Sequence, residues 1–283
     1  MIIVILKRFA LFLNMKKINV IKFNGEEEAF SSRKIYNSAK RSGASNDLAH
    51  KIMTELEKQA YSGIKTSDIY EEVRKRLREE NSRAGLRYNL KKALKELGPS
   101  GFPFEKYIGE VFTHLGYKVK INQFLAGKCC THEIDFVVEK DGLIYIGECK
   151  YRNLLGGIVH SKDALANYAR FLDIKERSEM KSIMVTNSRF TSRAVKYCNC
   201  VGVDVLGWKI PKRGLEYIIE NNKLYPITIL NSLNRDLAKI FVDKGIMLIK
   251  DLLDRDINDL SRITNISQKK LKPLITEASL LLS

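Results

Sequence analysis

The chain has 283 residues, of which 45% are hydrophobic and 29% are charged. This is the composition of an ordinary soluble globular protein with about two domains and room for a small third. The net charge of +16 is spread along the whole chain, which excludes a basic tail as its source. A diffuse positive field suits nucleic acid, and a compositional bias that favours solubility is the alternative.

The chain contains an odd number of cysteines, namely Cys129, Cys130, Cys149, Cys198 and Cys200. An odd count without a signal peptide predicts reduced thiols in a cytoplasmic protein. No CxxC pair is present, and the spacing of Cys198 and Cys200 is too short for a standard zinc knuckle. The sequence therefore argues against zinc and favours packing, although metal binding by one cysteine stays open.

Residues 1–14 are apolar but are interrupted by Lys7 and Arg8. The stretch is too short to span a bilayer, and its charges lie in the middle, where a signal peptide would not have them. Met15 offers an alternative start. Residues 1–14 are interpreted either as a start-site artefact or as an added strand.

The first segment begins with an expected strand at 18–23 and a tight turn at Asn24–Gly25. Helical periodicity then predicts helices at 32–42, 46–61, 67–80 and 83–97. The cluster of Gly, Pro and Ser at 98–103 is the clearest break in the chain and is expected to be a linker.

The second segment alternates between helical and strand patterns. A helix is expected at 104–115, ended by Gly116, and further helices at 158–175 and 189–200. Strands are expected at 117–123, 132–139, 143–151, 182–187 and 203–208. This alternation predicts an α/β sandwich around a mixed sheet, and the last fifty residues are expected to be all helical.

An Asp-Gly pair at 141–142 separates two runs rich in strand-forming residues. This pair is the strongest local signal for a two-residue hairpin loop, because both positions favour positive φ. The resulting register places Asp135 opposite Glu148 and Glu133 opposite Lys150. Because side chains alternate along a strand, all four are expected on one face.

Two carboxylates on directly opposite strand positions repel each other, so a purely structural sheet would avoid the pair. A divalent cation reverses this repulsion, and carboxylate oxygens are the ligands that Mg²⁺ prefers. Asp135 and Glu148 are therefore the predicted metal ligands, with Mg²⁺ or Mn²⁺, and Lys150 is placed to stabilise charge on a phosphate. A solvent-facing strand with chance ion pairs, such as Glu133 with Lys150, is the alternative.

On these residues the chain resembles the PD-(D/E)XK nucleases, especially Mrr-type restriction endonucleases and archaeal Holliday-junction resolvases. The resemblance covers residues 102–210, although Ile134 stands where many members have proline. It implies a catalytic role for Asp135, Glu148 and Lys150. A glutamate on the first helix completes the metal site in that family, which implies Glu105 here, with Glu110 as the alternative.

The helix at 158–175 carries His160, Lys162, Asn167, Tyr168 and Arg170. In Mrr-like families the corresponding helix lies beside the site and touches the scissile backbone. The resemblance therefore implies Lys162 and Arg170 as DNA contacts, whereas a solvated helix face is the alternative for each.

Residues 18–97 resemble the ATP-cone, a regulatory nucleotide-binding module. The match consists of Val20-Ile21-Lys22, Asn24-Gly25, Glu28, Phe30, Lys34-Ile35, Gly63–Ile69 and Arg87-Tyr88. Thr66 is expected at a helix N-cap, which is a ready anion site. Phe23 stands where members usually have arginine, so the choice between ATP and dATP is not predicted. The nucleotide-contact residues that the resemblance implies are Val20, Lys22, Glu28, Lys34, Thr66 and Tyr70.

The tail at 231–283 resembles a helix-hairpin-helix domain. Its turn reads Thr264-Asn265-Ile266-Ser267, where DNA-binding members have glycines that let backbone N–H groups approach phosphate. A DNA-binding tail and a protein-contacting tail therefore both stay open.

The sequence thus predicts an α/β protein with three domains: a mostly helical ATP-cone at 15–98, a nuclease-like sandwich with a mixed sheet at 102–228, and a small all-α domain at 231–283. The expected function is that of a metal-dependent DNA endonuclease, acting as a homo-oligomer with ATP or dATP as effector and no membrane partner. A nucleotide-responsive DNA-binding regulator and an assembly protein, each with an inactive nuclease fold, are the alternatives.

Overall fold

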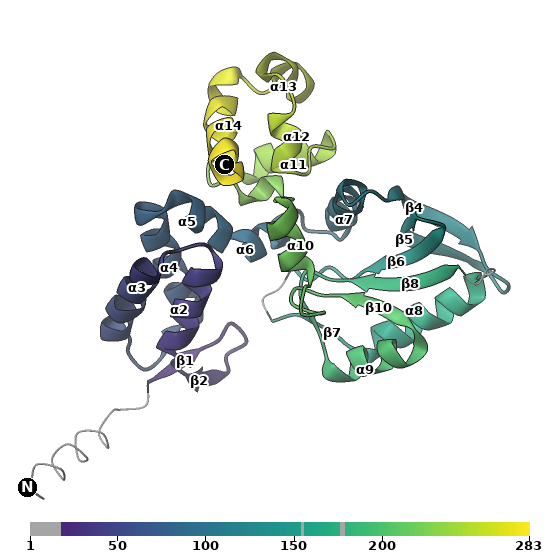
Figure 1. Cartoon of the computed structure of the whole chain (residues 1–283), viewed down its shortest axis with the longest axis horizontal. Coiled ribbons are helices and arrows are strands. Elements are labelled where there is room, and N and C mark those ends of the chain that lie inside the picture. Colours follow the sequence, from purple (N-terminus) through teal and green to yellow (C-terminus); the bar gives the residue numbers. More distant parts are fainter. Residues whose placement is uncertain (1–17, 154–155, 176–178) are drawn as a thin grey trace, which may run out of the picture. The chain divides into compact units, whose positions relative to one another are not determined.

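A computed structural model describes residues 18–153, 156–175 and 179–283 (Figure 1). The interpretations of residues 1–14 lie outside the described residues. The chain divides between Tyr88 and Asn89 into two compact units. Because the positions of these units relative to each other are not determined, each is described by itself.

The first unit is a small sheet followed by helices. The sheet has the order β2-β1-β3, with β2 antiparallel and β3 parallel to β1. The predicted strand and turn are confirmed, and Gly25 adopts a φ of 82° in the turn. The elements are β1 (Asn19–Ile21), β2 (Glu27–Ala29), α2 (Ser32–Arg41), α3 (Asn46–Gln59), β3 (Ile64–Lys65), α4 (Thr66–Glu80) and α5 (Ser82–Tyr88).

The helices of this unit bury one apolar stripe each in a shared core, which includes Ile35, Ile52, Val73 and Leu77. Sequence periodicity predicts these stripes because residues three or four apart lie on one helix face. The single helix expected at 83–97 is wrong. The structure has one helix that ends at Tyr88 and a second that begins after Asn89. Asparagine favours helix ends over helix interiors, which explains the break.

The second unit contains a five-stranded mixed sheet and the remaining helices. Its elements are α6 (Leu90–Lys95), α7 (Phe102–His114), β4 (Lys118–Ala126), β5 (Thr131–Lys140), β6 (Leu143–Cys149), β7 (Ile158–Val159), α8 (Ser161–Ile174), β8 (Met180–Val185), β9 (Arg189–Phe190), α9 (Ser192–Val201), β10 (Val203–Leu206), α10 (Leu215–Asn222), the 3₁₀ helix η1 (Ile227–Ile229), α11 (Arg235–Asp243), α12 (Ile249–Leu253), α13 (Ile257–Thr264) and α14 (Gln268–Leu282).

The sheet has the strand order β10-β8-β6-β5-β4. The pairs β4–β5 and β5–β6 are antiparallel, whereas β8 runs parallel to both β6 and β10. The expected α/β fold with a mixed sheet is thereby confirmed. The predicted register of the Asp-Gly hairpin is also confirmed, since Lys140 pairs with Leu143 and Phe136 pairs with Gly147.

Gly147 makes room for an aromatic ring of the neighbouring strand. A Cβ atom at this position would lie 2.0 Å from Cζ of Phe136, so no side chain fits there. The Phe136 ring also contacts Phe112 of α7, with 5.4 Å between ring centroids. Phe136 thus fixes the β5–β6 hairpin against α7.

Two helices begin later than periodicity predicts. The segment expected to start a helix at 158 instead forms β7, which pairs in parallel with β9, and α8 starts at Ser161. The β-branched pair Ile158–Val159 favours a strand, whereas Asp163 accepts the backbone N–H of His160 and starts the helix. Likewise, Thr191 caps α9 through the backbone N–H of Ala194.

The last part of the second unit is helical, as predicted. An isolated antiparallel bridge joins Pro226 to Leu248, and the backbone N–H of Ile227 donates to Met247. These backbone contacts place the segment that begins at Pro226 beside Met247 and Leu248. Both of these side chains are buried, as is that of Phe241. None of the helices in the described part of the chain combines the length and hydropathy that crossing a bilayer requires.

Candidate functional site

Asp135 and Glu148 meet at the open end of the β5–β6 hairpin. Oδ2 of Asp135 accepts a hydrogen bond from the backbone N–H of Cys149 at 2.6 Å. Glu148 is only 6% exposed and accepts hydrogen bonds from two positively charged side chains. Its Oε1 accepts from Nζ of Lys150 at 2.5 Å, and its Oε2 accepts from Arg170. The alternative ion pair of Glu133 with Lys150 does not form, because Lys150 turns to Glu148.

Glu105, in the first turn of α7, belongs to the same acidic cluster. Its pKa is raised to about 7, by burial first and then by the charges of Asp135 and Glu148. Glu110, the alternative, lies elsewhere: it lines a cavity of about 280 Å³ with Gly245 and Met247. The structure therefore brings Glu105, and not Glu110, to the two strand carboxylates.

The carboxylates of this cluster repel one another. Burial and the charge of Glu148 raise the pKa of Asp135 to about 6. Neighbouring like charges in a partly buried place disfavour the ionised forms, and a bound cation removes that penalty. Three carboxylates without a sulfur or imidazole donor form a set that fits a hard divalent cation.

The position of Lys150 depends on buried polar groups that sequence reasoning missed. Lys150 follows β6 directly, and its backbone N–H donates to Val185 while its carbonyl accepts from Oγ1 of Thr186. Oδ1 of Asn187 accepts from the backbone of Arg152, and Nδ2 donates back to the carbonyl. Thr186 and Asn187 are fully buried, and that combination of polarity and burial is not visible in sequence.

The two predicted DNA contacts on α8 differ in their surroundings. Lys162 is exposed, near the beginning of the helix. Arg170 lies two turns further along and its guanidinium bonds Glu148. Asn167, between them, is buried and donates to the hydroxyl of Ser182.

The first unit contains a separate open cavity of about 400 Å³. Three of the predicted nucleotide contacts, Lys34, Thr66 and Tyr70, line it. Tyr70 and Tyr88 stack with 5.0 Å between ring centroids, which provides an aromatic surface beside basic side chains. Arg41 and Tyr88 line the cavity too, although the sequence gives no contact role to either.

The other predicted contacts, Val20, Lys22 and Glu28, lie on β1, β2 and the turn between them. Val20 is buried at 3% exposure and serves the core. Glu28 bonds Lys34 at 2.9 Å and lies 3.4 Å from Lys22, so it links both lysines. The expected N-cap role of Thr66 is wrong, since Lys65 holds that position and Thr66 opens the first turn of α4.

The tail turn at 264–267 is closed by its own side chains. Asn265 takes a φ of 55°, the conformation that glycine would supply. The backbone N–H of Ile266 donates to Oγ1 of Thr264, and the Ile266 side chain is buried. This N–H group is therefore engaged within the turn.

Comparison with known protein families defines two parts of the chain. Residues 18–91 match the ATP cone domain, so this part of the chain is an ATP-cone regulatory domain. Residues 225–282 match the family described as AF1548-like, C-terminal, which begins close to the bridge between Pro226 and Leu248.

An uncharacterized protein of Archaeoglobus fulgidus is 36% identical over 166 residues, which are 58% of this chain and 92% of the relative. The crystal structure of the protein of unknown function AF1548 is 32% identical, with a TM-score of 0.57, and the match covers 64% of this chain and 97% of that one. The chain belongs to the family of these proteins. The structure of Can2 from Sulfobacillus thermosulfidooxidans in complex with cyclic tetra-adenylate is 14% identical in sequence, with a TM-score of 0.35, and the match covers 70% of this chain and 64% of that one.

Proposed function

We propose that the chain is a metal-dependent DNA endonuclease whose activity responds to ATP or dATP. The observation that carries this proposal is the convergence of Glu105, Asp135 and Glu148 beside the ammonium group of Lys150. Carboxylates from a helix and two strands, with a lysine two residues beyond one of them, are the groups that metal-assisted phosphodiester hydrolysis requires. The net charge of +16 supports a polyanionic substrate.

In this proposal Asp135 and Glu148 hold Mg²⁺ or Mn²⁺, and Glu105 completes the site. The cation, when bound, supplies Lewis acidity and lowers the pKa of a coordinated water. Lys150 stabilises the negative charge that develops on the phosphate, and Arg170 and Lys162 contact the DNA backbone. The hydrogen bond from Cys149 keeps Asp135 oriented while the carboxylates repel.

The ATP-cone supplies the regulatory half of the proposal. ATP or dATP would bind in the cavity lined by Lys34, Thr66 and Tyr70, with phosphates near the cations and the base near the paired tyrosines. Hydrolysis of the effector is not expected, because the chain lacks the P-loop motif GxxxxGK[ST].

One observation favours the alternative of a nucleotide-responsive DNA-binding regulator. Both oxygens of Glu148 already accept from cationic side chains, Lys150 and Arg170. A protein that only binds DNA could keep its acidic cluster neutralised in this way. Cleavage therefore has to be tested directly.

The test incubates the full chain with supercoiled, linear and branched DNA, with and without Mg²⁺ and ATP. The parent protein should cut at least one substrate with Mg²⁺, and EDTA should stop the reaction. Asp135→Asn and Glu148→Gln should abolish cleavage while DNA binding survives. Glu139→Gln is the matched control, because this exposed glutamate lies on the same strand as Asp135 but outside the acidic cluster.

The proposal is wrong if Asp135→Asn and Glu148→Gln, folded by circular dichroism, cut as fast as the control. Cleavage by the parent that is indifferent to EDTA would also contradict it. Nucleotide-dependent DNA binding without cleavage of any substrate would favour the regulator.

A further inference from the structure

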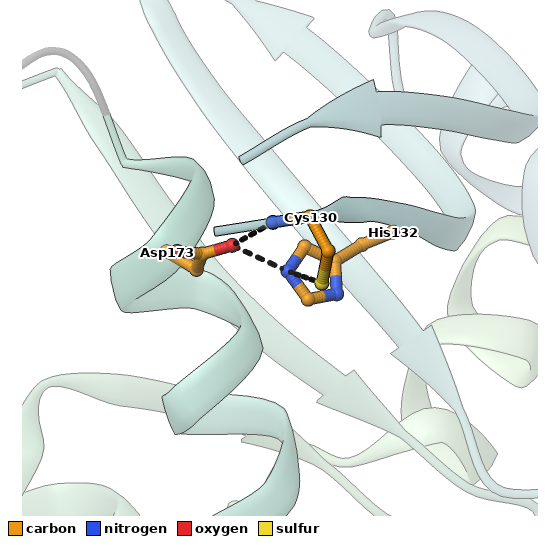
Figure 2. A group of neighbouring side chains, drawn as sticks. All are labelled: Cys130, His132 and Asp173. Carbon is orange, nitrogen blue, oxygen red and sulfur yellow. Dashed lines mark hydrogen bonds and ion pairs between the residues drawn. The ribbon is translucent and has the colours of Figure 1, made fainter. Parts of the chain in front are cut away.

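A second group of chemically reactive side chains lies where the loop between β4 and β5 meets the end of α8. Cys130 closes this loop, His132 lies near the start of β5, and Asp173 is the penultimate residue of α8 (Figure 2). One ligand atom from each of the three residues lies within 4.8 Å of the other two. The cluster shares no residue with the acidic cluster.

The three side chains converge on one point. Nε2 of His132 lies 2.8 Å from Oδ2 of Asp173 and 3.6 Å from Sγ of Cys130 (Figure 2). A nucleophilic triad needs two different ring nitrogens, one for the thiol and one for the carboxylate. Here the same nitrogen faces both groups, which is the arrangement of ligands around a shared cation.

The separations fit a tetrahedral transition metal. Bonds of about 2.3 Å to sulfur and about 2.0–2.1 Å to nitrogen, at a tetrahedral angle, place the two ligand atoms roughly 3.6 Å apart. This agrees with the observed Sγ to Nε2 distance. The shorter distance between His132 and Asp173 is that of a hydrogen bond, which a cation would replace with a modest opening of the pair.

A second cysteine, Cys129, precedes the cluster in sequence. The backbone N–H of Cys129 donates to Oδ1 of Asp173 at 2.9 Å. Cys129 and Cys130 are both exposed, whereas the side chains of His132 and Asp173 are 19% and 13% exposed. The cluster is thus open to solvent on the side of Cys130, where water can take the fourth position of a tetrahedral site.

The loop is shaped to hold the carboxylate in place. The backbone N–H groups of Cys129 and Cys130 donate to Asp173 at 2.9 and 3.4 Å, and that of Lys128 donates to its carbonyl at 3.0 Å. A Cβ atom at Gly127 would lie 2.1 Å from Oδ2 of Asp173, so only glycine leaves room for this carboxylate. Such fixed outer contacts orient a ligand before a metal arrives.

From this geometry we infer that Cys130, His132 and Asp173 form a binding site for Zn²⁺, with the fourth position open to water. Thiolate and imidazole donors select a borderline cation such as Zn²⁺ over Mg²⁺. Binding releases the thiol proton of Cys130 to solvent, while His132 coordinates as the neutral ring. The ion fastens the β4–β5 loop to α8 one helical turn beyond Arg170. The inference does not rest on the proposed nuclease activity.

The test uses the full chain, stripped of metal and kept reduced. Zn²⁺ is titrated against a chromophoric chelator, and Co²⁺ is added separately as a spectroscopic probe. One equivalent should bind, and Co²⁺ should produce the thiolate charge-transfer absorption of a tetrahedral sulfur site. Cys130→Ala and His132→Ala should weaken binding by more than about 100-fold, the upper range for loss of an outer-shell partner.

Cys200→Ser is the matched control, because this cysteine is also exposed but lies at the end of α9. It should bind Zn²⁺ like the parent. Asp173 also holds the loop in place, so Asp173→Asn could weaken binding by disturbing the loop. Cys130→Ala is therefore the decisive variant, because the Cys130 side chain is exposed. The inference is overturned if micromolar Zn²⁺ does not bind, if Co²⁺ gives no thiolate absorption, or if Cys130→Ala binds as tightly as Cys200→Ser.

Discussion

Arg170 donates a hydrogen bond to Glu148. The residue predicted to contact DNA phosphate is therefore held in place by a residue predicted to bind the metal. Glu148 is nearly buried and would keep only Lys150 as a cationic partner if Arg170 were removed. We expect Arg170→Ala to destabilise the metal-free chain by about 1–2 kcal/mol. Lys162→Ala, at an exposed position of the same helix, should change stability by less than about 0.5 kcal/mol.

Both substitutions should lower the slope of log K against log salt for DNA binding by about one. Thermal unfolding and salt titrations measure the two effects separately. Equal melting temperatures for the two variants would show that the contact between Arg170 and Glu148 contributes nothing to stability.

Lys150→Ala should reduce cleavage while Mg²⁺ binding stays intact. Lys150 contributes charge next to Glu148 and is not among the proposed metal ligands. Loss of one preorganised charged group of this kind costs on the order of 10²–10³-fold in rate. Single-turnover cleavage and calorimetric Mg²⁺ titration are the measurements. A loss of Mg²⁺ affinity as large as that of Asp135→Asn would instead make Lys150 part of the ligand arrangement.

Glu105→Gln should stabilise the metal-free chain at pH 8 but have little effect at pH 5. The folded-state pKa of Glu105, about 7, lies above its ordinary value, so its stabilising contribution is complete below about 4.5 and is lost as the pH rises through 7. Above pH 7 the fold holds a partly buried anion beside Asp135. After discounting for partial exposure, the gain is on the order of 1 kcal/mol.

Melting temperatures across this pH range, without metal, measure the effect. Glu139→Gln is again the control, since it removes an exposed carboxylate that lies on the same sheet but outside the acidic cluster. A stabilisation by Glu105→Gln that is as large at pH 5 as at pH 8 would mean that the carboxylate charge is not its cause.

Lys34→Ala and Tyr70→Ala should each weaken ATP or dATP binding by about tenfold. Lys34 supplies positive charge at the cavity of the ATP-cone, and Tyr70 supplies part of its aromatic surface. Calorimetry on the full chain measures the affinity. Lys58→Ala is the matched control, because Lys58 is exposed near the end of α3. No heat from the parent at millimolar nucleotide would contradict a functional nucleotide pocket.

Charge reversal of Lys269 and Lys270 should leave the salt dependence of DNA binding nearly unchanged. Both lysines are exposed at the start of α14, next to a turn whose N–H group at Ile266 is already engaged. Truncation at 231 is a poorer test, because it would uncover the apolar partners of the segment after Pro226. A large fall in the slope of log K against log salt would make the tail a main DNA-binding element.

The hairpin register could be derived from sequence because a two-residue Asp-Gly loop fixes every pair that follows it. Phe136 faces Gly147, as that register requires, and the same register places Asp135 and Glu148 next to each other on neighbouring strands. The ATP-cone was recognisable for a different reason, since its motifs extend over most of the first unit.

The remaining features depend on contacts between distant segments. Strands of two residues, such as β7 and β9, are too short for any period, and they form because they pair with each other. The bond from Arg170 to Glu148 joins α8 to β6, and the cluster at Asp173 joins a helix end to a loop 43 residues earlier. The absence of CxxC concealed that cluster, because it contains a single cysteine and its carboxylate comes from far along the chain.

Gly147 and Phe136 share one volume, since the ring of Phe136 occupies the space where a side chain at position 147 would begin. A larger residue at 147 is therefore compatible with the fold only if position 136 becomes smaller at the same time. Among relatives, these two positions should change together or stay as they are. Their joint substitution pattern would then indicate which relatives keep the strand spacing that brings Asp135 next to Glu148.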